Sequence, residues 1–519
     1  MKIRNFGIGV GCLGACLVLA GCASRPATLE ESTADVSSEL RPSEAGCDAK
    51  PTGIATSDYF LDFIVPAGLM PDSKFDGRAA HIEVHRVQPV YAHGKCPSVR
   101  TSAAVLIHGR AVPGPSAFDH RHDGGGELSV QENLARAGID TFAPSLLGYG
   151  RSSTFEDGLD DPCNASLRPY PSPLSNSCPY PEGCDLAVPV PPYAYDQQNS
   201  QLGTNPLSSG RCAHSTSTRF ARMDVWVRDV RQVVDDAILR AQPASGKVTL
   251  IGYSAGAPRV GRALYQSAAD YNRPWLRRDD IDHVRDSTDR VVFIAPLLIG
   301  PNEEPEETDM NPANGPFITF PLAISGRVTT GRWDMSAARH LVCTGHYVSG
   351  SAEEQFEQTL ARDALGSQWG GTNPADPTGV SRVPTFSTYG LNANVAPKID
   401  KPTLVLQGLD DSQARPELTC PFYNALPAEN KVLVELDCAS HTMLVEGCSG
   451  TRCEHEDDDI PPAYGTRGDD TWAGPSRTIQ AALVEWINDG KFHHERSGRF
   501  LVDTSGVVSA SAGVCALRQ

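Results

Sequence analysis

The chain has 519 residues, of which 40% are hydrophobic, so it is long enough for one large domain with insertions or for several domains. Its formal net charge is −18, and its lysines and arginines form no basic cluster, which argues against a nucleic-acid partner. The acidic balance favours solubility and does not indicate a class of binding partner.

The N-terminal segment has a charged start followed by an apolar stretch. Lys2 and Arg4 precede the stretch FGIGVGCLGACLVLAGC, which is too short and too rich in glycine for a good membrane-spanning helix. The stretch ends in LAGC, which is similar to the lipobox of a bacterial lipoprotein signal sequence, and this resemblance implies that residues 1–21 are removed and that Cys22 carries the lipid. Such acyl chains anchor a protein to the membrane without crossing it. Ala23 follows the cysteine, and the resemblance then favours the cell envelope, with the outer membrane as the location.

Residues 22–50 are polar and lack hydrophobic periodicity, which predicts a flexible tether between the lipid and the folded part. Of the fifteen cysteines, Cys12 and Cys16 lie in the signal sequence and Cys22 is the lipid site, which leaves twelve. An even number in an exported protein indicates disulfide bonds, but the spacing does not determine which cysteines pair. The chain has no CxxC pair, which argues against a zinc site. No cofactor is expected.

Beyond the tether, the hydrophobic pattern predicts strands that alternate with helices. Residues 59–65 and 79–90 resemble strands, and the alternation in the second predicts that His81, Glu83 and His85 face solvent. Further strands are expected at 102–109, from 139, at 247–253, 290–298, 402–408 and 431–436, and helices at 127–138, 224–241, 258–268, 336–345, 351–365 and 478–488. This alternation indicates an α/β protein with a doubly wound, mostly parallel sheet.

Two segments interrupt the alternation. Residues 153–218 are rich in proline and contain four cysteines, which predicts an insertion held by disulfide bonds. Residues 300–395 separate two sheet strands by more chain than one crossover needs, so a cap or lid is expected there. The core of the protein is then made by residues 51–299 and 396–519.

Ser254 lies in the sequence GYSAG, between Gly252 and Gly256, and fits the pattern GxSxG. A serine hydroxyl is a weak nucleophile, and it needs a base, a group that orients the base, and donors for the oxyanion. The pattern alone is weak because glycine and serine are common. Here it follows a predicted strand and opens a predicted helix, which is the context of a nucleophile elbow.

The GYSAG motif and its context resemble those of the α/β-hydrolase family, whose members have an oxyanion loop, a nucleophile, an acid and a histidine in this order along the chain. His108 and Gly109 follow a predicted buried strand and resemble the HG oxyanion loop of that family. The resemblance implies that the oxyanion is bound by the backbone N–H of Arg110 or Ala111 and by that of Ala255.

The remaining family motifs lie downstream. The segment PTLVLQGLDD resembles the strand that ends in GxxD, which implies Asp411 as the acid, with Asp410 as the alternative. The segment CASHTMLVE resembles the histidine loop and implies His441 as the base. Ser145 replaces the Asp that the family usually has before the loop GYGRSS, a departure outside the triad. The matching motifs cover residues 100–155, 222–300 and 395–490.

The implied triad of Ser254, His441 and Asp411 predicts a carboxylesterase-like hydrolase, which cleaves an ester or related acyl bond of a small or oligomeric substrate through an acyl-enzyme. Three alternatives stay open. One is a peptidase of the prolyl-aminopeptidase-like branch, whose GGPG-type oxyanion loop differs from HGRAVPG here. Another is a carbon–carbon bond hydrolase, which shares the triad. The third is a non-catalytic surface lipoprotein whose cap binds a partner. The sequence identifies neither the substrate nor the oligomeric state.

Overall fold

The computed structural model describes twelve stretches of the chain, and all of them belong to one compact unit, Cys47–Gln519. These stretches are residues 50–70, 73–92, 102–109, 112–155, 223–265, 278–300, 348, 351–364, 367, 391–411, 414–447 and 474–510. The signal sequence, Cys22, the tether and nearly all of the cysteine-rich insertion lie outside them, so those features stay predictions. None of the helices in the described stretches has the length and hydropathy needed to span a bilayer.

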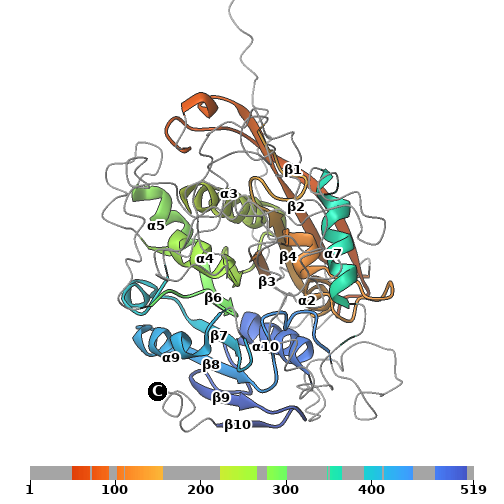
Figure 1. Cartoon of the computed structure of the whole chain (residues 1–519), viewed down its shortest axis with the longest axis vertical. Helices are drawn as coiled ribbons and strands as arrows, with labels where there is room; N and C mark the ends of the chain where they lie inside the picture. Colours follow the sequence, from red (N-terminus) through yellow and green to blue (C-terminus); the bar gives the residue numbers. More distant parts are fainter. Residues whose placement is uncertain are drawn as a thin grey trace, which may run out of the picture. The chain divides into compact units, whose positions relative to one another are not determined.

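The described strands form one sheet in the order β1-β2-β4-β3-β5-β6-β7-β8-β9-β10 (Figure 1). They are β1 (Gly53–Ile64), β2 (Ala79–Val90), β3 (Ser102–Ile107), β4 (Ile139–Ser145), β5 (Val248–Tyr253), β6 (Thr288–Ile294), β7 (Thr403–Gly408), β8 (Lys431–Leu436), β9 (Gly498–Val502) and β10 (Val508–Ala510). All pairs from β4 to β9 are parallel, whereas β1 with β2, β2 with β4 and β9 with β10 are antiparallel. The predicted mostly parallel sheet is confirmed.

The described helices are α1 (Gly114–Phe118), α2 (Val130–Arg136), α3 (Met223–Ala241), α4 (Gly256–Leu264), α5 (Arg278–Asp286), α7 (Ser351–Arg362), α9 (Pro416–Ala425) and α10 (Pro475–Asp489), with 3-10 turns η1 (Ser73–Phe75) and η8 (Ala396–Lys398). The sequence pattern did not predict α1, α5, α9, β9 or β10. Helix α2 begins later than predicted because Ser129 caps it: the Ser129 hydroxyl oxygen accepts the Glu132 N–H at 2.9 Å. The predicted helix at 336–345 lies outside the described residues.

Side chains alternate along the central strands between two hydrophobic cores. On β3, Val105 and Ile107 belong to the core with α3 and α4, whereas Ala104 and Leu106 belong to the core with α2 and α10. Figure 1 shows α3 and α4 on one side of the sheet and α2 and α10 on the other. Because both faces of β3 are buried, its sequence is an unbroken apolar run.

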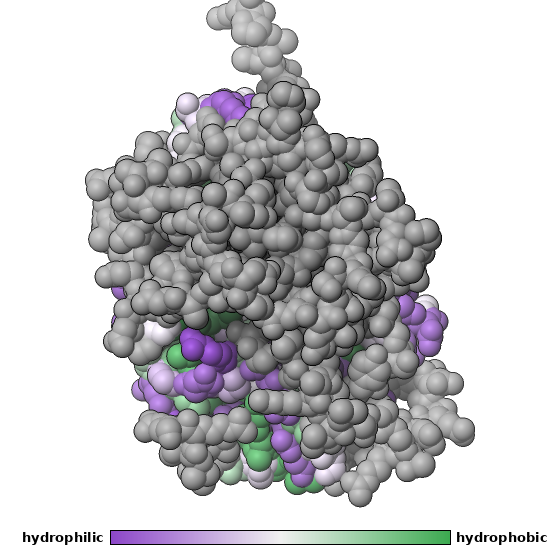
Figure 2. Space-filling view, in the orientation of Figure 1, coloured by the Kyte–Doolittle hydropathy of each residue, from purple (hydrophilic) through white to green (hydrophobic). Residues whose placement is uncertain are grey.

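Large hydrophobic side chains that stay exposed in the described stretches come from the sheet, from the turn before β10 and from α3, where Leu239 is 72% exposed. Ile64 of β1 is 61% exposed and Val507, in the turn before β10, is 52% exposed. On the face shown in Figure 2, hydrophilic and hydrophobic residues lie next to one another over the described surface. Single exposed apolar side chains are common on soluble proteins and need no partner.

The prediction that alternate residues of β2 face solvent is wrong for Glu83 and His85. Glu83 is 0% exposed and His85 is 5% exposed, whereas His81 is half-buried. The Glu83 carboxylate accepts hydrogen bonds from Arg151 Nε at 2.6 Å and from Arg362 Nη1 of α7 at 2.7 Å. The period of two places Glu83 and His85 on the same face of β2. The arginines that cover Glu83 come from distant parts of the chain, so the local pattern could not predict its burial.

His85 lies between two carboxylates, Asp58 of β1 and Asp119 after α1. Its Nδ1 is 2.5 Å from Asp58 Oδ1 and its Nε2 is 2.9 Å from Asp119 Oδ2. Burial lowers the pKa of His85 and nearby Arg362 adds to this, but the hydrogen bonds to both carboxylates outweigh them and raise the pKa above 6.5. The folded protein therefore holds a proton at His85 more tightly than the unfolded chain does.

This raised pKa predicts a pH-dependent contribution to stability. The contribution is fully present below the unfolded pKa of 6.5 and is lost as the pH rises through the raised folded pKa. We expect His85→Gln to lower the melting temperature most at pH 5.5–6, and by progressively less at higher pH, in calorimetric scans. His283→Gln, which removes an exposed histidine 2.6 Å from Asp235, should have a small effect throughout. A loss for His85→Gln that grows with pH contradicts the prediction.

Candidate active site

Ser254 lies in a tight turn between β5 and α4. Its φ is +53°, in the left-handed region that non-glycine residues seldom adopt. The end of β6 and the residues that follow it hold this turn in place. The Ser254 N–H donates to Ile294 O at 2.9 Å, and the Leu297 N–H donates to Ser254 O at 3.1 Å. The hydroxyl of Ser254 is thereby fixed at the carboxyl end of the central strand.

The glycines of the GxSxG motif are required by close packing. A Cβ at Gly256 would lie 2.1 Å from the carbonyl oxygen of Ile107, and one at Gly252 would lie 2.7 Å from Gly256 O. Gly109 is close to Ser254 itself, since a Cβ at Gly109 would lie 3.1 Å from Ser254 Cβ. Gly256 therefore lets the turn pack against β3, Gly252 lets the end of β5 pack against the start of α4, and Gly109 lets the loop after β3 approach Ser254.

The structure brings Ser254, His441 and Asp411 together. His441 Nε2 lies 2.8 Å from Ser254 Oγ, and His441 Nδ1 lies 2.9 Å from Asp411 Oδ2. All three residues are buried. Because a carboxylate only accepts hydrogen bonds, Nδ1 carries the hydrogen of the neutral ring and Nε2 is left to accept the serine proton.

These residues meet because of the sheet topology. Ser254 follows β5, Asp411 follows β7 and His441 follows β8, and strands β5, β6, β7 and β8 are consecutive and parallel. The carboxyl ends of parallel strands lie at one edge of the sheet, where the loops that carry functional groups converge. Residues 187 positions apart in the sequence are thereby placed in hydrogen-bonding contact.

Asp411, the residue favoured by the GxxD match over Asp410, is the carboxylate that contacts the imidazole. Besides His441, its Oδ1 accepts the Ala414 N–H at 2.7 Å. That second hydrogen bond orients the carboxylate toward the ring. Asp410 is one residue nearer β7, and its backbone N–H donates to Ala439 O at 3.0 Å.

Of the predicted oxyanion donors, Ala255 is described, whereas Arg110 and Ala111 lie outside the described residues. Ala255 is the N-cap residue of α4 and follows Ser254 directly. Its backbone N–H has no acceptor among the described residues. An N–H at a helix N-terminus beside a serine hydroxyl is suited to bind negative charge.

The loop after β3 is held by His108 and by the buried Arg259 of α4. His108 Nε2 accepts the Leu146 N–H at 3.0 Å, and its Nδ1 donates to Gly109 O at 2.8 Å. Arg259 Nη1 donates to the carbonyl oxygens of His108 and Gly109 at 2.9 and 3.1 Å. Burial, with a further effect of nearby Arg259, holds the pKa of His108 well below 6.5, so this histidine is neutral and acts in shaping the loop.

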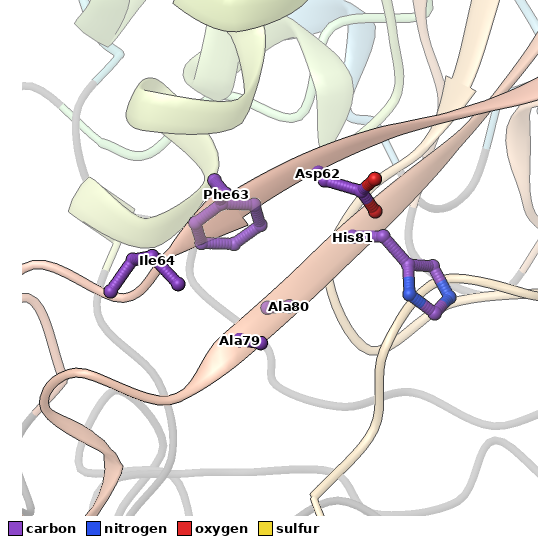
Figure 3. A pocket seen from close by; sticks show the side chains of 6 residues that line it. All are labelled: Asp62, Phe63, Ile64, Ala79, Ala80 and His81. Carbon is purple, nitrogen blue, oxygen red and sulfur yellow. The ribbon is translucent and has the colours of Figure 1, made fainter. Parts of the chain in front are cut away.

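Two further features of the described residues include none of the residues of this triad. A hollow of about 410 Å³ lies on the β1–β2 hairpin, where Figure 3 shows Asp62 and His81 on paired strands. Strands β4 and β3 separate β2 from β5, so this hollow is not part of the Ser254 site.

Potential metal-ligand atoms of His122, Asp123 and Glu354 lie within 4.8 Å of one another. Hydrogen bonds within that cluster account for its geometry, and they connect the loop of His122 and Asp123 to α7.

The part of the chain expected to form a cap contains α7, which packs against the core. Gln355 Nε2 of α7 donates to Ser116 O at 3.1 Å, and the Ser351 hydroxyl donates to Val445 O at 3.2 Å. Most of the segment 300–395 lies outside the described residues, so a cap stays a prediction. Among the cysteines of the described stretches, Cys420 and Cys438 are both disulfide-bonded.

The strand order, with a nucleophile elbow after β5, an acid after β7 and a histidine after β8, defines the α/β-hydrolase fold. No protein-family model and no curated protein matches the chain.

Similar solved structures come from several hydrolases. The thioesterase domain from the curacin biosynthetic pathway is 15% identical over 75% of this chain and 95% of that chain, with a TM-score of 0.37. Monoglyceride lipase from Saccharomyces cerevisiae is 13% identical over 83% and 97%, with a TM-score of 0.38. The 2-hydroxy-6-oxo-6-phenylhexa-2,4-dienoate hydrolase of Rhodococcus sp. strain RHA1 is 14% identical over 75% and 95%, with a TM-score of 0.32.

Proposed function

We propose that this protein is a serine hydrolase that cleaves carboxylic esters through an acyl-enzyme. The observation that supports the proposal is the continuous chain of hydrogen bonds from Asp411 through His441 to Ser254, at 2.9 and 2.8 Å. A serine hydroxyl within 2.6–3.2 Å of an oriented imidazole has the base that it needs to become a nucleophile.

The reaction has two stages. His441 Nε2 takes the Ser254 proton as Oγ attacks the ester carbonyl, and Asp411 stabilises the imidazolium that forms. The Ala255 N–H, with a second donor from the loop after β3, binds the oxyanion. His441 then gives its proton to the leaving alcohol, and an acyl-enzyme remains. Water that His441 deprotonates attacks the acyl carbon, which releases the acid and restores Ser254.

The test is a panel of p-nitrophenyl esters of different acyl length beside amino-acid p-nitroanilides. We expect turnover of at least one ester and none of the anilides, because the loop HGRAVPG differs from that of the prolyl-aminopeptidase-like branch. Turnover of an anilide at a rate equal to that of the esters would favour a peptidase instead. Labelling by a fluorophosphonate probe reports whether the serine is activated, and an unlabelled protein would favour a non-catalytic role.

A further inference from the structure

Tyr253, the residue that precedes the nucleophile, contacts the base as well. It is the last residue of β5, and its hydroxyl donates to the backbone carbonyl oxygen of His441 at 2.7 Å. Its ring stacks on the imidazole, with centroids 5.6 Å apart and an angle of 25° between the planes. One side chain of the elbow thereby contacts both the backbone and the ring of His441.

The rest of the histidine loop is held by Glu446. Glu446 is 3% exposed, and its Oε2 accepts the Ser440 N–H at 3.1 Å. The Thr442 hydroxyl donates to Glu446 Oε1 at 3.0 Å, and the Ser440 hydroxyl donates to the same oxygen. The two neighbours of His441 are therefore fixed without Tyr253, so the loop should keep its fold when the tyrosine hydroxyl is removed.

We propose that Tyr253 is a positioning residue that holds His441 for proton transfer, an inference that rests on the proposed function. Its hydroxyl fixes the backbone carbonyl of His441 and so holds the adjacent Cα that carries the imidazole, which keeps Nε2 aligned with Ser254 Oγ. Its ring face lies where the imidazole becomes a cation, and an aromatic face attracts a cation within about 6 Å of its centroid. Tyr253 thus connects the turn that carries Ser254 to the base, His441.

Two variants separate the hydroxyl from the ring. Tyr253→Phe keeps the stacked ring and removes only the hydrogen bond to His441. We expect kcat on the best p-nitrophenyl ester to fall by about 10-fold, with KM unchanged, because a small misplacement of the base affects the transition state and not substrate binding.

Tyr253→Leu removes both contacts. We expect a fall of about 100-fold, together with a shift of the acidic limb of the kcat/KM profile to lower pH, because the charged imidazole loses the ring face.

The matched control is Tyr423→Phe in α9. The Tyr423 hydroxyl also donates to backbone carbonyl oxygens, those of Lys431 and Gly498, both at 3.0 Å. This hydroxyl contacts the first residues of β8 and β9 and none of the three residues of the triad, so its loss should change the melting temperature and leave kcat unaltered.

The outcomes distinguish this inference from the proposed function. If the wild type is labelled by the fluorophosphonate probe and Tyr253→Phe has wild-type kcat, the positioning role is wrong while the hydrolase proposal stands. An equal fall in kcat for Tyr423→Phe would also overturn it, since the effect would then be structural. If the wild type itself is neither labelled nor active, the proposed function fails first.

Discussion

Replacing Ser254 with alanine should reduce ester turnover to the assay background while the protein stays folded. The hydroxyl oxygen is the only proposed nucleophile, and its loss leaves His441 with no proton to accept. Removal of a catalytic serine lowers kcat by roughly 10⁶-fold in well-studied serine hydrolases, so a fall of about 10⁴-fold or more is expected here. The measurement is kcat on the best p-nitrophenyl ester, with fluorophosphonate labelling in parallel.

The control for this prediction is Ser245→Ala, in the exposed turn between α3 and β5. The Ser245 hydroxyl oxygen accepts the Lys247 N–H at 3.1 Å and makes no contact with the triad. This variant should keep its activity and its labelling. A Ser254→Ala protein that retains most of the esterase activity would show that another residue is the nucleophile.

Asp411→Asn should have the second-largest effect. Asparagine has nearly the same shape, but its amide group can donate to Nδ1 and so favour the tautomer that carries the hydrogen on Nε2, which cannot accept the serine proton. The imidazolium would also lose its counter-charge. Together these losses predict a fall in kcat of about 10⁴-fold at neutral pH, with the melting temperature little changed.

Asp410→Asn is the matched control, because it makes the same substitution one residue away. The carboxylate that contacts His441 is that of Asp411, at 2.9 Å from Nδ1, so the Asp410 variant should keep activity within about 10-fold of wild type. If the two variants lose activity equally, Asp411 does not act as the orienting acid. If only Asp410→Asn is inactive, the alternative reading of the sequence is the correct one.

Much of the core follows from local sequence patterns. The apolar runs predicted β3, β5, β7 and β8, and the amphipathic spacing predicted α3 and α10 within a few residues of their observed bounds. The elements that were missed are short or irregular. Helix α9 contains Pro421, and β9 and β10 have five and three residues, too few to show a clear period.

Local sequence patterns could not predict contacts between residues that lie far apart in the chain. The alternation on β2 placed Glu83 and His85 together on one face, but only the tertiary structure shows that Arg151 and Arg362 cover Glu83. The contact of Tyr253 with His441 joins residues 188 positions apart and leaves no mark in the spacing of either motif.

By itself the sequence determined the class of fold, the GxSxG turn at Ser254 and the order in which a serine, an aspartate and a histidine follow their strands. These features depend on side-chain period and turn chemistry, which act over a few residues. Only the tertiary structure decided which of two adjacent aspartates faces the imidazole and which side chains hold it. The reason is physical: neighbouring residues in a turn point in different directions, and their partners come from strands that are adjacent only in the folded sheet.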